Sequence, residues 1–340
     1  MPNYNNAEFL RHRFDSVLNQ TLGDFEIIVC DSYSVDGAWR IIESYAAQHK
    51  RISAIQVPKE GIYAGWNECL SRASGEFVYI ATSDDTMAPT CLEKLVAALN
   101  ENPQCNVAMC GLDVINSNGQ SLPVHRNWRS FPAGCFFESL FDTAHIRVEP
   151  LDGILSGSLH CIWHSTTQIL VRRAVYERHG VYRCDLGSIA DFEWNTRVAL
   201  RESVVYIPEV LATLRVHDAS ASSQRGGYST KDIGEKRRIL GLLLDSLAVD
   251  KPELAERLRN AGWFDAFLFQ EAIYLLKEYG LSLNCMVGLR DLWSISSRDK
   301  VLFLHILFAA LRGKERVRRV FVDRLLAKLN MRLDDYIRPI

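Results

Sequence analysis

The 340-residue sequence has little of what marks several common classes of protein. Its nine cysteines are scattered, odd in number and without a CxxC pair, so we expect buried, reduced thiols and not a disulfide framework. The formal net charge of −2 provides no general field for binding nucleic acid. No apolar run is long enough to span a bilayer, and the opening MPNYNN lacks the pattern of a secretory signal. These absences predict a cytoplasmic protein.

The composition is that of a globular protein, with 48% hydrophobic and 24% charged residues. Strand patterns at 25–30, 52–57, 77–82, 107–115, 168–172, 204–207 and 211–217 alternate with helix patterns at 7–22, 37–49, 63–73, 89–100, 174–180 and 191–202. This alternation predicts an α/β fold with a doubly wound, mostly parallel sheet. A Ser/Gly-rich segment at 219–229 is typical of a linker. We therefore predict a domain over 1–222 and a helical C-terminal region over 223–340.

Two segments that read as buried parallel strands each end in acid. FEIIVCD at 25–31 ends in Asp31, and FVYIATSDD at 77–85 ends in Asp84 and Asp85. In an open α/β sheet the ligand crevice lies at the carboxyl ends of the strands, where three carboxylates repel one another unless a cation or a hydrogen-bond donor lies between them. Hard divalent ions take oxygen ligands and bridge carboxylates to phosphates. The pattern predicts a metal–diphosphate site on a nucleotide-binding sheet.

The order of motifs resembles that of the family 2 inverting glycosyltransferases, which have the GT-A nucleotide-sugar-binding fold. The resemblance covers residues 2–222 and depends on PNYN at 2–5, QTLGDFEIIVCDSYSVDG at 20–37, GIYAGWNECLSRASGEFVYIATSDD at 61–85, ADFEWNTRV at 190–198 and YIPEVLATLRVH at 206–217. It implies a hexosyltransferase-like enzyme that transfers a sugar from a nucleotide sugar to an acceptor hydroxyl with inversion, in cell-surface polysaccharide or glycan synthesis. The acceptor would be a glycan, a lipid-linked sugar or another hydroxyl compound. The QxxRW signature of processive synthases is absent, which favours single additions.

The resemblance also implies roles for individual residues. Asp191 matches the catalytic base, and Asp85 and His217 match positions that hold a divalent metal, Mn²⁺ or Mg²⁺. The residues that match the nucleotide-sugar-binding side are Pro2, Tyr4, Asn5, Asp31, Asp36, Asp84 and Arg215. The chemistry needs both groups, because a divalent ion neutralises the leaving diphosphate while a carboxylate on the opposite face of the sugar removes the acceptor's proton.

Other interpretations of the same residues stay open. A helix N-cap is the structural alternative for Asp191, and a purely structural role is the alternative for His217. HCIWH at 160–164 contains zinc-type ligands without a completing pair, and SDDT at 83–86 has the wrong spacing for a phosphatase with an aspartyl nucleophile. A non-catalytic nucleotide-sugar-binding or scaffold protein is the remaining alternative.

Both ends of the chain depart from a simple enzyme domain. Met1 stands where the first, usually central strand should end, so we expect that strand to be missing and the sequence to be truncated. Near the other end, the apolar run 301–311 precedes an octet, 312–319, with five basic residues and one acidic. This segment predicts either a buried helix followed by a solvated one, which we favour, or a peripheral contact with the inner face of the plasma membrane.

Overall fold

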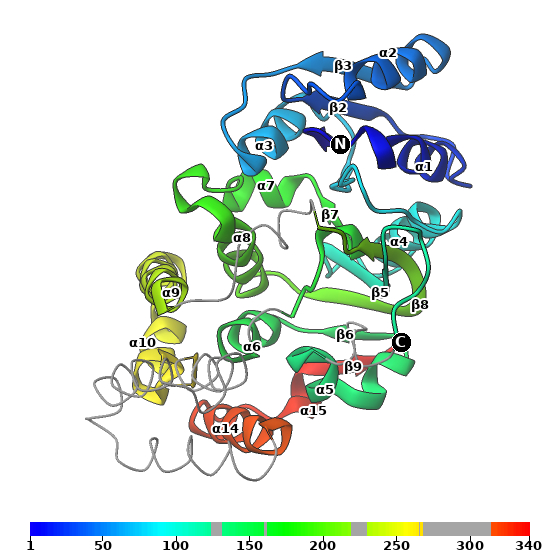
Figure 1. The fold of residues 1–340 in the computed structure, drawn as a ribbon. Helices are drawn as coiled ribbons and strands as arrows, with labels where there is room; N and C mark the ends of the chain where they lie inside the picture. The colour runs from blue at the N-terminus through cyan, green and yellow to red at the C-terminus, as the bar shows by residue number, and fades with distance from the viewer. Residues whose placement is uncertain (124–130, 160–161, 219–229, 265, 268–313) are drawn as a thin grey trace.

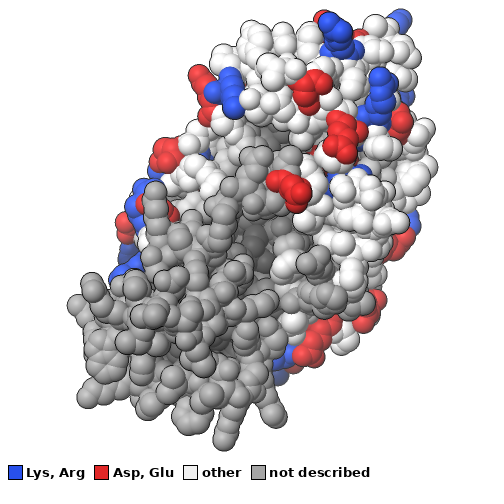
Figure 2. Space-filling model, in the orientation of Figure 1, with Lys and Arg blue, Asp and Glu red and all other residues white. Residues whose placement is uncertain are grey.

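The computed structural model describes residues 1–123, 131–159, 162–218, 230–264, 266–267 and 314–340. Within them the strands form a three-stranded sheet near the N-terminus and a six-stranded sheet, with helices packed around both (Figure 1). One hydrophobic core cluster extends from Met1 to Met331 and joins the two sheets. On the face shown in Figure 2, basic and acidic side chains are interspersed over the described part of the surface.

The first sheet presents Asp31 at its carboxyl edge. Its strands are β1 (Pro2–Asn3), β2 (Ile27–Asp31) and β3 (Ile52–Gln56), which pair in parallel in that order. They alternate along the chain with α1 (Ala7–Leu18), α2 (Ala38–Gln48) and α3 (Ile62–Arg72). Every residue of β2 is buried. Ile27 and Val29 belong to the main core, whereas Ile28 and Cys30 pack in a second cluster with Cys69 of α3. This period of two places apolar side chains on both faces of the sheet.

The second sheet has the strand order β4-β7-β5-β8-β6-β9. Its strands are β4 (Phe77–Val78), β5 (Val107–Ile115), β6 (His145–Arg147), β7 (Ile169–Arg172), β8 (Val204–Arg215) and β9 (Ile337–Pro339). β5 and β8 pair in parallel, and the other pairs are antiparallel. The β5–β8 ladder changes register at Gly111, where a Cβ would lie 2.9 Å from the backbone oxygen of Glu209, so glycine is required against the bend in β8.

The helix that contains Asp191 packs against a buried helix. α8 (Ala190–Ala199) follows the 3₁₀ segment η5 (Cys184–Ile189) and packs on α6 (Leu151–Leu159), all of whose residues are buried. The two helices approach closely because Gly153 has no side chain, since a Cβ there would lie 2.5 Å from the backbone nitrogen of Leu200.

The other helices surround the sheets. They are α4 (Cys91–Glu101), α5 (Pro132–Phe137), α7 (Ala174–His179), α9 (Thr230–Asp250), α10 (Pro252–Ala261), α14 (Lys314–Lys328) and α15 (Leu333–Tyr336), with 3₁₀ segments η3 (Glu138–Asp142) and η4 (Thr166–Gln168). Among the helices that the structure describes, none combines the length and the apolar character that crossing a membrane requires.

The predicted α/β class is confirmed, and the elements differ from the prediction mainly in their ends. The strand expected at 77–82 is limited to Phe77–Val78, and the strands expected at 204–207 and 211–217 form one strand, β8. The second sheet is mixed where a mostly parallel sheet was predicted, because β6, β7 and β9 run antiparallel to their neighbours.

The first strand is short where the sequence predicted it to be missing. Pro2 and Asn3 pair with Cys30 and Asp31, and the Met1 carbonyl accepts a hydrogen bond from the Cys30 nitrogen at 3.2 Å. In the described residues β1 pairs with β2 and not with β4, so the two sheets remain separate.

The C-terminal region contains a strand that the sequence did not predict. β9 pairs antiparallel with β6, so residues beyond the predicted boundary at 222 take part in the six-stranded sheet. The predicted linker 219–229, the apolar run 301–311, and His160 and Cys161 of the HCIWH segment lie outside the described residues.

Candidate functional site

Two acidic side chains with different surroundings follow β4. The carboxylate of Asp85 is buried, its Oδ1 accepts a hydrogen bond from the backbone nitrogen of Arg215 at 2.6 Å, and its Oδ2 accepts one from the Thr82 hydroxyl. Burial and the neighbouring charge of Asp84 raise the pKa of Asp85 to about 7. Both oxygens of Asp85 are therefore engaged in fixing the end of β8 to the loop after β4.

The carboxylate of Asp84 is directed toward an imidazole. Its Oδ2 lies 3.1 Å from Nε2 of His217, and its side chain is 20% exposed. The His217 ring packs against the Phe9 ring, with centroids 4.6 Å apart. Arg215 fixes this arrangement, because its Nε donates to the Asp84 carbonyl at 2.7 Å and its Nη1 donates to the carbonyls of Asn116 and Ser117.

The separation of Asp84 from His217 fits a shared divalent ion. Two ligands at right angles around an octahedral ion, each about 2.1 Å from it, are about 3 Å apart. Within the described residues no three His, Cys, Asp or Glu side chains come together in a set that could hold a metal.

The carboxylate of Asp31 is completely buried and well supplied with donors. Its Oδ1 accepts from Asn3 at 2.7 Å and from the Ser34 hydroxyl at 2.6 Å, and its Oδ2 accepts from the Ser34 nitrogen at 3.0 Å. Gln56 Nε2 lies 3.5 Å from Oδ2. Asp31 therefore fastens the end of β1 to the loop after β2.

Asp36 and Asn5 fasten the same two loops together. Asp36 accepts from the backbone nitrogens of Ala7 at 2.8 Å and Ala38 at 3.0 Å, so one carboxylate serves the N-termini of α1 and α2. Asn5, whose φ is 52°, accepts from the Val35 nitrogen and donates its own backbone N–H to the Ser34 hydroxyl. Both residues have clear structural roles at this edge.

Tyr4 remains accessible at the rim of these loops. Its ring is 40% exposed, and the ammonium of Lys59 lies 3.8 Å from the ring centroid. Pro2 lies in β1 and faces Gly65 of α3. A Cβ added to Gly65 would lie 3.6 Å from the Pro2 Cβ, which is an ordinary van der Waals distance. Asn6 donates to the Ser83 hydroxyl at 2.7 Å and so links this region to the loop that carries the acidic pair.

Asp191 is in the first turn of α8 and is not its N-cap. The N-cap is Ile189, which makes no side-chain capping bond, and Asp191 Oδ1 accepts from the nitrogen of Phe192 at 2.8 Å. In the described residues Asp191 forms no hydrogen bond with the acidic pair, Arg215 or His217. The structure thus brings Asp84, Asp85, Arg215 and His217 together, joins Pro2, Asn5, Asp31 and Asp36 in a second group, and places Asp191 on a separate element.

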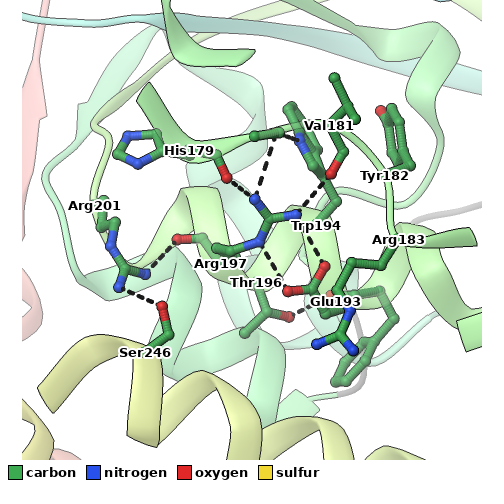
Figure 3. A network of polar contacts seen from close by, with 12 residues as sticks. His179, Val181, Tyr182, Arg183, Glu193, Trp194, Thr196, Arg197, Arg201 and Ser246 are labelled. Atoms are coloured by element: carbon green, nitrogen blue, oxygen red, sulfur yellow. Dashed lines mark hydrogen bonds and ion pairs between the residues drawn. The ribbon is translucent and has the colours of Figure 1, made fainter. Parts of the chain in front are cut away.

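A buried ion pair fixes the loop that leads into α8 (Figure 3). Arg197 pairs with Glu193 through two bonds, Nε to Oε1 at 2.8 Å and Nη2 to Oε2 at 3.0 Å, and Nη2 also donates to the Val181 carbonyl at 2.9 Å. Its Nη1 donates to the His179 carbonyl. The sequence analysis did not identify Arg197, Thr82, Ser34 or Lys59. For two of these residues the spacing in the sequence indicates the contact, because Arg197 follows Glu193 by four residues and Thr82 precedes Asp85 by three.

Comparison with known proteins finds a family match for the N-terminal part of the chain. Residues 1–163 match the family model for Glycosyl transferase family 2. An uncharacterized glycosyltransferase of Rickettsia typhi is 25% identical over 309 residues, which cover 83% of this chain and 91% of that protein. A chondroitin synthase of Pasteurella multocida is 26% identical over 131 residues, and the match covers 38% of this chain and 14% of the synthase.

The fold is similar to that of a solved structure. The crystal structure of residues 1–349 of TarS of S. aureus superposes with a TM-score of 0.59 at 17% identity and covers 98% of this chain and 87% of that one. The same TarS fragment in complex with UDP-GlcNAc gives a TM-score of 0.57 at 18% identity, with the same coverage. At this identity the likeness shows the GT-A type fold alone.

Proposed function

We propose that this glycosyltransferase, whose residues 1–163 match the model for Glycosyl transferase family 2, transfers a sugar from a nucleotide-sugar donor to an acceptor hydroxyl with inversion. The observation that carries this proposal is the pair formed by Asp84 and His217 beside Arg215, with a further carboxylate, Asp191, on a different element. An inverting displacement needs two such centres, one at the leaving group and one at the acceptor.

The nucleoside half of the donor binds where the two N-terminal loops meet. Tyr4 and Lys59 provide an exposed aromatic face and a positive charge at this edge. Asn3 and Ser34 donate hydrogen bonds to the Asp31 carboxylate, so the nucleobase of the donor can bind this carboxylate only if it replaces one of them. Asn5 and Asp36 hold the two loops in position. UDP-GlcNAc is the first donor to test, because the similar TarS fragment was crystallised with it.

Asp84 and His217 would hold a divalent ion, Mn²⁺ or Mg²⁺, which would supply positive charge against the leaving diphosphate. The geometry favours Asp84 over Asp85 as the ligand, because both oxygens of Asp85 already accept hydrogen bonds. Asp85 then positions Arg215, whose backbone it binds, and Arg215 in turn binds the Asp84 carbonyl.

Asp191 takes the proton from the attacking hydroxyl. Its carboxylate is in the first turn of α8, on a different element from the Asp84–His217 pair. The acceptor belongs to a cell-surface glycan or a lipid-linked sugar, and the match to a chondroitin synthase supports a role in polysaccharide synthesis.

The experiment is a panel of nucleotide sugars, each incubated with Mn²⁺ and the protein, with release of nucleoside diphosphate as the readout. We expect nucleoside diphosphate to be released from one donor, and we expect this release to stop when the metal is chelated. Binding of a nucleotide sugar without release in the presence of any acceptor tested would instead support a non-catalytic nucleotide-sugar-binding protein.

A further inference from the structure

We propose that Phe9 of α1 is a positioning residue for the diphosphate side of the site: its ring fixes the plane of the His217 imidazole and the place of the Arg215 guanidinium, and so holds the Asp84–His217 pair in the geometry that binds a divalent ion. This inference rests on the proposed function, in which Asp84 and His217 hold that ion.

The Phe9 ring contacts both groups directly. Its centroid lies 4.6 Å from the centroid of the His217 ring, with 50° between the two ring planes, and 5.0 Å from Cζ of Arg215. These distances are those of a tilted aromatic pair and of a cation–π contact. One side chain thus touches the imidazole that faces the Asp84 carboxylate and the guanidinium that binds the Asp84 carbonyl.

Phe9 differs in this respect from the other buried apolar residues of its helix. Leu10, Phe14 and Val17 belong to the main hydrophobic core cluster, whereas Phe9 is only 5% exposed but is not a member of that cluster. A phenyl ring is ordinarily buried among other apolar side chains, where it stabilises the fold most. A buried ring placed instead against an imidazole and a guanidinium indicates a role at the site.

His217 depends on such a support because little else holds it. It lies two residues beyond the end of β8, and the last backbone hydrogen bond before it, within the described residues, joins the Val216 nitrogen to the Ile115 carbonyl at 2.8 Å. Its side chain meets Asp84 at a single atom, Nε2. One hydrogen bond leaves the imidazole plane free to turn, whereas a ring packed against it fixes the orientation on which metal binding depends.

The first turn of α1 is itself fixed to both halves of the site. Asn6, its N-cap, donates to the Ser83 hydroxyl at 2.7 Å in the loop of the acidic pair, and the Ala7 nitrogen donates to Asp36 at 2.8 Å in the loop after β2. In the part of the chain that the structure describes β1 and β4 do not pair, so no strand ladder joins these two loops. The start of α1 links them, and Phe9 therefore has a defined position relative to both.

The test measures Mn²⁺-dependent binding of a nucleoside diphosphate by calorimetry, with whichever of UDP and GDP the wild type binds more tightly. Phe9→Leu removes the ring and keeps an apolar side chain. We expect it to weaken binding with Mn²⁺ by about 10–100-fold, the usual effect of losing a residue that orients a metal ligand, and to leave metal-free binding within about threefold. Phe9→Met should behave as Phe9→Leu, whereas Phe9→Tyr keeps the ring and should restore Mn²⁺-dependent binding.

Phe14→Leu is the matched control, because it removes a ring from the same helix away from the site. Phe14 is fully buried and stacks on Tyr45 with 4.4 Å between centroids. Because Phe14 belongs to the main core, Phe14→Leu should lower the melting temperature at least as much as Phe9→Leu, yet leave Mn²⁺-dependent binding unchanged. Equal losses of Mn²⁺ dependence in the two leucine variants, or a loss that Phe9→Tyr does not restore, would overturn the positioning role.

Asp84→Asn separates this proposal from the one on which it rests. If Asp84→Asn loses the Mn²⁺ dependence while Phe9→Leu retains it, the positioning role is wrong and the metal assignment stands. If Asp84→Asn keeps the full Mn²⁺ dependence, or if the wild type binds equally with and without Mn²⁺, the metal assignment fails and the positioning role fails with it.

Discussion

At the scale of single residues, the sequence predicted that Asp31, Asp84 and Asp85 would gather at the carboxyl ends of strands, whereas the hydrogen bonds of the structure put Asp31 in a different group from Asp84 and Asp85. Which carboxylate is open to a ligand depends on where the backbone of β8 ends, since the Arg215 nitrogen binds Asp85 and leaves Asp84 facing His217. Likewise, Asp31 could be found from its strand, whereas its enclosure by Asn3 and Ser34 depends on a contact between two loops. Local sequence patterns cannot predict hydrogen-bond partners that come from distant segments of the chain.

The two acids after β4 therefore respond differently to substitution. Asp84→Asn should abolish the Mn²⁺-dependent binding of UDP, because it removes a charged metal ligand, and the loss should reach at least about tenfold in affinity. Asp85→Asn should retain metal-dependent binding within a few fold, because the amide oxygen still accepts the Arg215 N–H. Calorimetry on both variants measures this difference, and loss of metal dependence in Asp85→Asn alone would return the ligand role to Asp85.

At the scale of elements, long strands and amphipathic helices were predictable because their periodicity is local. β6 and β9, which are three residues each, were not predicted, because they exist only through pairing with other strands. The position of α8 depends in the same way on tertiary contacts, namely Gly153 of α6 beneath it and the bonds of Arg197 to the preceding loop.

The ion pair within α8 should contribute more to stability than a similar pair at the surface. Glu193 and Arg197 have 4% and 12% exposed side chains, whereas the Arg173–Glu177 pair of α7 is 42% and 58% exposed. Arg197→Met leaves a buried carboxylate without its partner, so we expect a loss of about 3–5 kcal/mol in the free energy of unfolding. Arg173→Met should cost less than about 1 kcal/mol. Denaturant melts measure both, and equal effects would contradict the account of the loop.

A second prediction at this scale concerns Glu202, which joins the end of α7 to the start of β5. Burial raises its pKa, but hydrogen bonds from His179, Arg178 and Asn106 outweigh that effect and lower the pKa to about 2. A lowered pKa stabilises the folded state above the unfolded value near 4.5, by about 3 kcal/mol, and this contribution is lost as the pH falls toward 2. Glu202→Gln should therefore be less stable than the wild type at pH 7, and the difference should shrink between pH 4.5 and 2. A constant difference over that range would show that the charge is not responsible.

At the scale of the whole molecule, the C-terminal segment takes part in the six-stranded sheet. β9 pairs with β6, and the Val148 nitrogen donates to the Tyr336 carbonyl at 2.8 Å. Removing residues 333–340 should therefore destabilise the protein by about 2–4 kcal/mol through lost backbone bonds, although the predicted domain ends at 222. Thermal melts of the two chains test this, and identical melting curves would show that β9 adds nothing to the sheet.

The central claim is that two separate acidic centres act on one sugar, and Asp191→Asn tests it most directly. The substitution keeps the shape of the side chain and removes its ability to accept a proton, and among the described residues Asp191 forms no hydrogen bond with the Asp84–His217 pair. With the donor found in the panel, we measure binding by calorimetry and transfer by diphosphate release for the variant and the wild type. The account predicts unchanged donor affinity and a transfer rate lower by about 10²–10⁴-fold, whereas transfer within a few fold of the wild-type rate would contradict it.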